Sequence, residues 1–337
     1  MPRAPGLDFR QAVSLIKTVC EVAGSKDLIE RARVGLDRAG VLRAIQKHDD
    51  EPIFGWLAKA TAYQGVSDAA AQSFMDMHGT ASAGDIRRSL EETTACEKLH
   101  SYWQFVQCGF RKADWTCNQP ELIRDCPLPG LDLRNGSLVQ SAFGLYFYFR
   151  DVAGGDFVAW VDRQLRGIAP ADAPARLIIP LRHVHGVSDK VLNMALASLL
   201  LAGDDHRKAW KAAGAQMLAI DTLVHAWLHR TGILRGLGAE HAYGQCYGAG
   251  HCADILRQVS DRIDARRFNR TFPRRFPRFV QHAIWRFCAQ QQLGQCNGNT
   301  IDDRRRCALA DCILFDDCAR LKLGRPTPAQ APSPEPA

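Results

Sequence analysis

The sequence of 337 residues contains no long hydrophobic run. Its longest apolar stretch, over residues 192–202, is interrupted by Asn193 and Ser198 and is far shorter than the ~20 residues of a membrane-spanning helix. The N-terminal residues lack the apolar centre of a secretory signal. We therefore expect a cytoplasmic protein without a membrane partner. In that reducing compartment its twelve cysteines are free thiols or metal ligands more often than disulfides.

Strand signals are few and no internal repeat is present, whereas apolar residues recur at helical spacing through most of the chain. The sequence therefore predicts an all-α fold. Residues 108–136 are predicted to be irregular because Cys, Pro and Gly punctuate them. The last 14 residues, with five prolines, are predicted to be a disordered tail. We expect two helices within 8–48, a third over 51–76, a pair within 176–202, and one from about 216 to 231.

Positive charge is not in excess over the first three quarters of the chain. Residues 257–337 hold 15 Lys and Arg against 8 Asp and Glu, whereas the preceding residues hold 28 of each sign. Fourteen of the fifteen are arginines, whose guanidinium groups form two-point contacts with phosphate. Phenylalanines alternate with them, so the segment is either a solvated helix over an aromatic core stripe or a polyanion-binding surface. The candidate phosphate contacts are Arg266, Arg267, Arg270, Arg274 and Arg275.

The most informative stretch begins with a helical hairpin. An apolar segment ends at a turn formed by His185, Gly186, Val187 and Ser188, and a second apolar helix starts near Asp189. Glycine permits a positive φ, and serine is a common N-cap. The backbone N–H groups of such a turn, in front of a helix N-terminus, form a site for an anion the size of phosphate.

A second motif places one acidic residue, Asp221, at the start of another apolar helix, in the segment Ile220–Val224. An aspartate there is commonly a helix N-cap and nothing more. It is also a position where a carboxylate can be held in apolar surroundings to stabilise positive charge. Both readings remain open at this point.

Taken in order, these motifs resemble the helix-hairpin-helix (HhH-GPD) superfamily of DNA glycosylases, and endonuclease III in particular. The family hairpin L-P-G-V-G-x-K corresponds to residues 184–190, and the family signature V-D-T-H-V corresponds to residues 220–224. The family element N-R-[TL] resembles residues 229–231, and a helix end Q-Q-T-S-D resembles residues 62–68. The resemblance covers roughly residues 50–80 and 176–320.

The chain also departs from the family pattern. His185 replaces the proline of the hairpin, Ser188 its second glycine, and Leu223 the histidine of V-D-T-H-V. The loop between Lys190 and Asp221 is longer than usual. These changes motivate a rival hypothesis, a non-catalytic DNA-binding or damage-sensing protein of the same fold. A second rival is a zinc-stabilised helical protein that binds nucleic acid.

The resemblance implies a two-lobed helical fold and base-excision repair, with a monomer acting on duplex DNA that carries a damaged or mismatched base. In a bacterium such a protein would be associated with the nucleoid. The target base is flipped out of the stack, Gln64 fills the gap, and the turn at 185–188 holds phosphate. Asp221 stabilises the positive charge that develops at C1′. Lys190 occupies the position of the nucleophile that forms a Schiff base in members with AP lyase activity.

Four C-terminal cysteines complete the resemblance. Endonuclease III-like proteins often end with C-x6-C-x2-C-x5-C, which binds a [4Fe–4S] cluster. Here Cys312 and Cys318 keep the last spacing, while Cys296 and Cys307 precede them with wider gaps. Four thiolates are also the ligand set of structural zinc, so iron–sulfur, zinc and unliganded thiols all remain open.

The other cysteines give weaker signals. Cys96, Cys108, Cys117 and Cys126 form a second group, in which the last three are evenly spaced. Even spacing is no recognised ligand signature, so packing is favoured over a second metal site. Cys246 and Cys252 lie in a glycine-rich loop with His241 and His251, where loop polarity or DNA contact explains the histidines better than a metal does.

We divide the chain into six segments: N-terminal helices (1–50), the first part of the glycosylase core (51–95), an unmatched cysteine-containing insertion with helices (96–175), the helix-hairpin-helix and catalytic Asp helix (176–256), an arginine-rich helical segment with the cysteine cluster module (257–323), and the disordered tail (324–337).

Overall fold

The fold is taken from a computed structural model. It describes residues 7–63, 66, 68–92, 95–111, 113–131, 133, 136–184 and 186–323. Over these residues the chain forms α-helices and short 3₁₀ or π turns with one isolated bridge and no strand. The prediction of an all-α fold is therefore confirmed. Gln64, His185 and the tail at 324–337, each named in a sequence-based prediction, lie outside the described residues.

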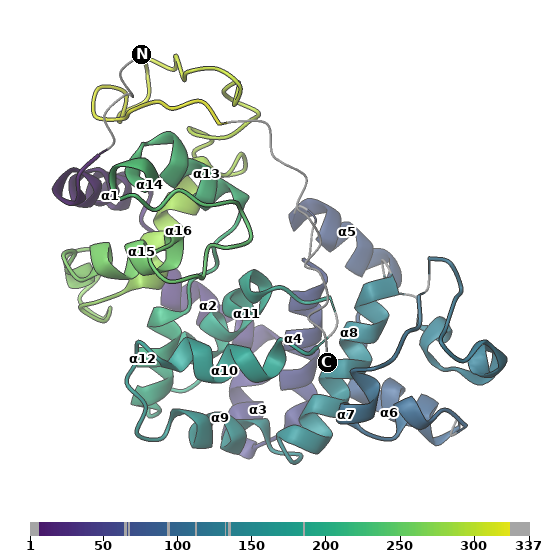
Figure 1. The fold of residues 1–337 in the computed structure, drawn as a ribbon. Helices are drawn as coiled ribbons and strands as arrows, with labels where there is room; N and C mark the ends of the chain where they lie inside the picture. The colour runs from purple at the N-terminus through teal and green to yellow at the C-terminus, as the bar shows by residue number, and fades with distance from the viewer. Residues whose placement is uncertain are drawn as a thin grey trace. The chain divides into compact units, whose positions relative to one another are not determined.

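The chain divides into two compact units. Unit 1 comprises the described residues of Met1–Leu28 and Leu218–Ala337, and unit 2 comprises those of Ile29–Met217. Unit 1 contains five α-helices among its described residues, coloured purple and green in Figure 1: α1 (Phe9–Ala23), α13 (Thr222–Arg230), α14 (Ile233–Gly236), α15 (Cys252–Ser260) and α16 (Pro277–Cys288).

Unit 1 is built around the contact between α1 and α16, which come from opposite ends of the chain. A capping box between Asp8 and Gln11 starts α1, and it satisfies two N–H groups that a helix start leaves open. The following chain lies very close to α16, because a Cβ added at Gly24 would meet the ring of Phe279 at 2.7 Å. Helix α16 also contacts α13 and α15, so it is the central support of the unit.

Unit 2 contains the helical hairpin. Its α-helices are α2 (Leu28–Arg38), α3 (Val41–Lys47), α4 (Asp50–Thr61), α5 (Asp68–His78), α6 (Ala83–Glu91), α7 (Tyr102–Phe105), α8 (Gly136–Phe147), α9 (Phe157–Leu165), α10 (Ala173–Leu181), α11 (Asp189–Ala202) and α12 (Lys208–Gln216). Ten of the fourteen residues of α11 are buried, and this helix packs on both α12 and α4. The hairpin of α10 and α11 therefore rests on a broad apolar core.

Several helix boundaries differ from the predicted ones. Residues 8–48 form three helices instead of two, because Gly40 adopts a φ of 71° between α2 and α3. The helix predicted over 51–76 is two helices, α4 and α5. The helix predicted from about 216 to 231 begins only at Thr222, since Asp221 caps it. The segment at 108–136 is irregular as predicted, with 3₁₀ turns and only the first residue of α8 among its described residues.

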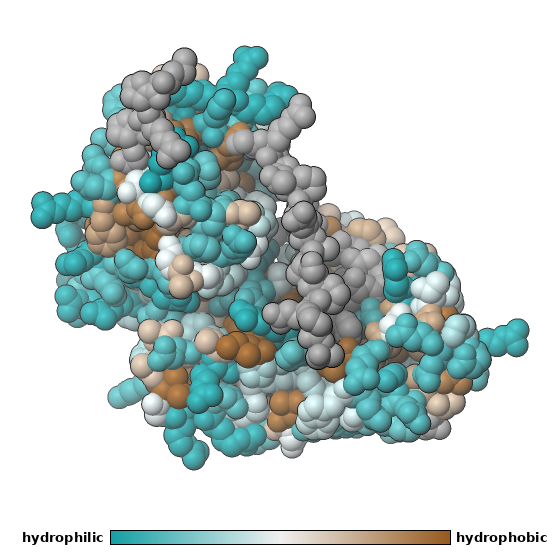
Figure 2. All heavy atoms as spheres, viewed as in Figure 1, coloured by the Kyte–Doolittle hydropathy of each residue, from teal (hydrophilic) through white to brown (hydrophobic). Residues whose placement is uncertain are grey.

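The part of the chain that the structure describes contains no helix both long and apolar enough to cross a membrane. Figure 2 shows one face of the molecule, where hydrophilic residues cover most of the surface and hydrophobic residues form separate small patches. Scattered apolar residues of this kind are normal for a protein surface.

Candidate functional site

Asp221 lies at the first turn of α13, in unit 1. Its backbone is extended and its carboxylate Oδ1 accepts the N–H of Val224 at 2.9 Å, which is the geometry of a helix N-cap. The residues before it, Leu218, Ala219 and Ile220, are buried, whereas Asp221 itself is half-buried. The carboxylate therefore stands where a buried segment reaches the surface.

Side chains from other elements hold this buried segment. The Tyr247 hydroxyl donates to the carbonyl of Leu218 at 3.0 Å and accepts the N–H of Ile220 at 3.1 Å. The N–H of Ala219 donates to Oε1 of Gln281, on α16, at 3.4 Å. These bonds satisfy buried backbone groups that would otherwise be costly. We call Tyr247 and Gln281 the Asp221 clamp.

A buried cation completes these surroundings. Arg278, on α16, is 9% exposed, and its guanidinium donates to Oε1 of Gln281. Burial lowers the pKa of Arg278 to about 10, while electrostatic interactions with Tyr247 and Asp221 act in the opposite direction. Arg278 therefore places a buried positive charge near the Asp221 carboxylate.

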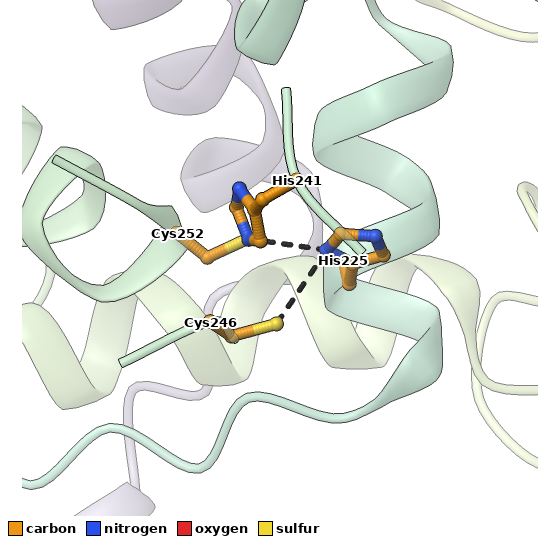
Figure 3. Close-up of side chains that lie close together, drawn as sticks. All are labelled: His225, His241, Cys246 and Cys252. Carbon is orange, nitrogen blue, oxygen red and sulfur yellow. Dashed lines mark hydrogen bonds between the residues drawn. The ribbon is translucent and has the colours of Figure 1, made fainter. Parts of the chain in front are cut away.

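Four side chains near Asp221 form a compact group of metal-binding type: His225 on α13, His241 and Cys246 in the following loop, and Cys252 at the start of α15 (Figure 3). Their ligand atoms all lie within 4.8 Å of one another. Nδ1 of His225 is 3.4 Å from Sγ of Cys252 and 3.5 Å from Sγ of Cys246. Nε2 of His241 is 3.3 Å from Sγ of Cys252.

The two thiols of this group affect each other's ionisation. Hydrogen bonds from Cys252 and from the two imidazoles lower the pKa of Cys246. The hydrogen bond to Cys246, together with burial, raises the pKa of Cys252. Only one of the two thiols is therefore readily ionised by the protein alone. A bound cation would stabilise both thiolates, because metal ligation deprotonates cysteine.

The four C-terminal cysteines converge in the same unit. Cys296, Cys307, Cys312 and Cys318 line one cavity, together with Trp227 and Arg230 of α13. Burial, followed by the charges of the neighbouring thiols, raises the pKa of Cys318 to about 11. The sequence-based grouping of these four cysteines thus corresponds to one place in the structure.

Arg230 connects this cavity to α13. Its side chain is buried, forms an ion pair with Asp303, and attracts the Cys296 thiolate. Hydrogen bonding to Cys288 and the charge of Arg230 lower the pKa of Cys296. Arg230 is therefore a structural cation at the cysteine cavity and not simply a charge at a helix end.

The hairpin turn lies in unit 2. Gly186 has a φ of 69° and is exposed, and Ser188 is the N-cap of α11, as the sequence predicted. Arg182 donates two hydrogen bonds to the Asp189 carboxylate, at 2.9 and 2.6 Å. Lys190 is half-buried in the first turn of α11. Val187 is buried, so it supports the turn instead of facing a ligand.

The arginine-rich segment differs from the predicted helix. Arg266 and Arg267 lie in a 3₁₀ turn, and Arg270, Arg274 and Arg275 lie in the following loop before α16. Prolines and Asn269 break the helical pattern there. All five arginines are exposed, while Phe272, Phe276 and Phe279 are buried beneath them.

The cysteines of unit 2 also approach one another. The backbone N–H of Gln119 donates to Sγ of Cys117 at 3.4 Å, and the side-chain oxygen of Gln119 lies 3.5 Å from Sγ of Cys96. Burial, together with the charges of the other thiols in this group, raises the pKa of Cys108 and raises that of Cys126 to about 11. Cys96, Cys108, Cys117 and Cys126 are therefore neighbours in the structure, which their spacing in the sequence does not indicate.

Sequence reasoning overlooked His225, Gln281 and Tyr247. His225 lies one helical turn after Asp221 and 21 positions before Cys246, so no short motif contains both ligands. The available signal was the recurrence of His and Cys in 241–252, to which a histidine on the preceding helix could have been added. No family model, no curated protein and no solved structure matches the chain.

Proposed function

We propose that the protein is a DNA base-excision glycosylase with AP lyase activity. The observation that carries this proposal is the cysteine cavity: four cysteines selected through the glycosylase resemblance line one cavity in the unit that also contains Asp221. The two compact helical units also agree with a two-lobed fold.

For the four thiols we propose a [4Fe–4S] cluster in place of a single ion. The described residues contain one group of three or more ligand atoms all within 4.8 Å, and it is the His225 group and not these cysteines. A cubane cluster holds its four thiolates further apart than one ion does. Such a cluster would supply a cross-link that ties Cys296, Cys307, Cys312 and Cys318 into one rigid loop.

Asp221 would act on the sugar. As the bond between C1′ and the base breaks, its electrons leave with the base and positive charge develops on the sugar. The Asp221 carboxylate, fixed by the clamp, would stabilise that charge. The Lys190 amine would form a bond to C1′ and give up a proton, and the C1′–O4′ bond would then break as O4′ takes up a proton, which leaves a Schiff base at C1′. Loss of a C2′ proton from this Schiff base would break the C3′–O3′ bond and expel the 3′ phosphate.

Each unit has its own candidate contacts to a DNA backbone. The exposed turn at Gly186 precedes the N-terminus of α11, where backbone N–H groups favour a phosphate. Arg267, Arg270 and Arg274 are exposed cations that would add sequence-independent, salt-sensitive affinity. The base would be flipped before cleavage, because its glycosidic bond is inaccessible within the duplex.

A non-catalytic DNA reader is the second candidate. Oδ1 of Asp221 accepts the Val224 N–H, so an N-cap role accounts for this carboxylate without any chemistry. The replacement of the family histidine by Leu223 is in line with lapsed activity. This candidate shares the DNA surface, but it releases no base and forms no covalent intermediate.

Borohydride trapping separates the two candidates. Duplex oligonucleotides with an abasic site, uracil, 8-oxoguanine or an oxidised pyrimidine would be incubated with wild type, Lys190→Ala and Lys208→Ala. Lys208 is a matched control because it also begins a helix of unit 2. We expect a covalent adduct with wild type and with Lys208→Ala, but none with Lys190→Ala. Intact binding with no adduct on any substrate would remove the lyase assignment, and the additional absence of base release would favour the reader.

A further inference from the structure

The geometry points to a single zinc ion held by His225, His241, Cys246 and Cys252, whose role is to position Asp221. We call these four residues the His2Cys2 site. The inference concerns a metal centre separate from the cysteine cavity, and its catalytic consequence rests on the proposed function. The evidence is the spacing of the ligands, the orientation of the imidazoles and the connection of the site to the Asp221 clamp.

The ligand spacing matches one tetrahedral ion. Zinc binds sulfur at roughly 2.3 Å and nitrogen at roughly 2.0–2.1 Å, so a tetrahedral site places nitrogen and sulfur ligands about 3.6 Å apart. Three of the four nitrogen–sulfur distances of the His2Cys2 site are 3.3, 3.4 and 3.5 Å, and the fourth is within 4.8 Å. Two thiolates with two imidazoles are a ligand set of structural zinc, and four protein ligands leave no open position for a substrate.

The His241 imidazole is oriented as a metal ligand usually is. Nδ1 of His241 is 2.7 Å from the carbonyl oxygen of Ala239, so its N–H can donate there and leave Nε2 as a neutral ligand. A ligating histidine commonly donates its second N–H in this way, which fixes the tautomer. His251 stacks on His241 with 4.0 Å between ring centroids and 7° between planes, and this contact further restricts the His241 ring.

The ligands adjoin Asp221 from two directions. The backbone N–H of His225 donates to the backbone carbonyl of Asp221 at 3.0 Å. One ligand therefore belongs to the helical turn that Asp221 begins. Cys246 immediately precedes Tyr247, whose hydroxyl holds the residues before Asp221. A metal at the His2Cys2 site would therefore fix α13 to the loop that carries Tyr247, and both of these elements hold the residues around Asp221.

The metal content provides the first test. Wild type purified with zinc and iron is expected to contain one zinc per chain, whereas Cys252→Ser and His225→Gln lose it and His251→Gln keeps it. His251 is the matched control, because it is a histidine of the same loop that touches the site without belonging to the ligand group. Cobalt exchanged into folded wild type should give thiolate charge-transfer bands. Wild type with no zinc and no such bands would overturn the inference.

The positioning role requires a readout other than metal content. Tyr247→Phe removes the hydroxyl but no metal ligand, so this variant should keep its zinc. Hydrogen exchange of the amides at 218–224 should become at least about fivefold faster in Tyr247→Phe and in zinc-depleted wild type. Helix α1 of the same unit is the internal reference. Unchanged exchange at 218–224 after zinc removal would overturn the positioning role.

Measurements of enzyme activity then test whether the zinc and the positioning of Asp221 matter for base release. Loss of zinc or of the Tyr247 hydroxyl should lower the rate of base release at saturating enzyme, with little change in affinity for lesion-free DNA. If wild type releases no base from any substrate, the proposed function fails, yet zinc content and hydrogen exchange still decide the metal inference. If base release is present and zinc is not, the metal inference fails and the glycosylase assignment stands.

Discussion

Asp221 and Lys190, the two residues to which we assign chemistry, have different kinds of support. Asp221 lies in unit 1 at the end of a segment held by Tyr247 and Gln281, near a buried guanidinium and the His2Cys2 site. Lys190 lies in unit 2 on a helix held by apolar packing, with an ion pair between Arg182 and Asp189 beside it. The first residue is fixed by polar contacts, whereas the second depends on the hairpin backbone.

This comparison suggests that the two residues tolerate change differently. A carboxylate that stabilises charge must be placed closely, because electrostatic stabilisation depends on preorganised geometry. A lysine side chain is long and flexible, so it can reach its target even when the backbone that carries it is held less rigidly. The polar support in unit 1 is therefore expected to matter for the rate of reaction, and the hairpin mainly for binding.

The largest expected effect is that of Asp221→Asn. Asparagine caps a helix about as well as aspartate, so stability should hardly change, while loss of the charge should slow base release by at least about 100-fold. The measurement is single-turnover cleavage on the substrate identified by trapping, alongside thermal unfolding and DNA binding. Asp221→Ala, which also loses the cap, is expected to lose about 1 kcal/mol of stability as well. Full activity of Asp221→Asn would mean that Asp221 serves only as the N-cap of α13.

The second effect concerns the cysteine cavity. Cys318→Ala should abolish the iron content and lower the free energy of unfolding of unit 1 by more than about 3 kcal/mol, because metal binding and folding are coupled. Hydrogen exchange in α11 of unit 2 should not change. Cys20→Ala is the control, since Cys20 is a buried cysteine of unit 1 outside both ligand groups. Equal effects of the two variants would mean that the cavity is ordinary core.

Sequence reasoning succeeded where the structure is determined locally. The hairpin turn at Gly186 and the cap at Asp221 involve residues near one another in the chain. The helix predicted over 216–231 was wrong in its boundary, because the cap at Asp221 stops a pattern that hydrophobic periodicity alone continues. A period describes one face of a helix but does not locate its end.

The rest could not be predicted because it depends on tertiary contacts. Tyr247 reaches Leu218 across 29 positions, and Gln281 reaches Ala219 across 62. Neither residue type is distinctive in a loop or on a helix. His225 faces its partners only once α13 and α15 are packed around α16. The arginine loop was assigned to a helix because its phenylalanines recur at helical spacing, yet these rings form a cluster beneath a loop.

The third effect tests the hairpin side of the comparison. Gly186 has a φ of 69°, and a Cβ in the left-handed region costs about 1–2 kcal/mol. Gly186→Ala should therefore destabilise unit 2 by this amount in urea unfolding and weaken DNA binding, while base release from bound DNA stays close to wild type. Gly130→Ala is the control, because a Cβ there meets nothing within 4 Å and its φ is not positive. A collapse of the release rate in Gly186→Ala alone would show that the hairpin governs chemistry as well.

The smallest expected effect is a difference in how the stability of the two units depends on pH. Asp50, in α4 beneath α11, has its pKa raised above 3.8 mainly by burial. The folded state therefore binds this proton more tightly than the unfolded chain does, so the stability that it contributes is present below pH 3.8 and is lost as pH rises through the folded pKa. In Asp50→Asn the amide oxygen can still accept the Phe157 N–H that Oδ1 accepts at 2.9 Å, and this pH-dependent loss should vanish.

The stability of unit 1 should depend on pH in the opposite direction and increase as pH rises. Protons compete with metal for thiolates and imidazoles, so metal-dependent stability grows as pH rises. Hydrogen exchange measured from acid to neutral buffer, in wild type and in Asp50→Asn, compares amides of α11 with those of α13. We expect the wild-type α11 amides to lose protection relative to the variant with rising pH, while the α13 amides gain it in both proteins. Parallel responses in the two helices would mean that the units unfold together, and the contrast between polar and apolar support would no longer describe how Asp221 and Lys190 are held.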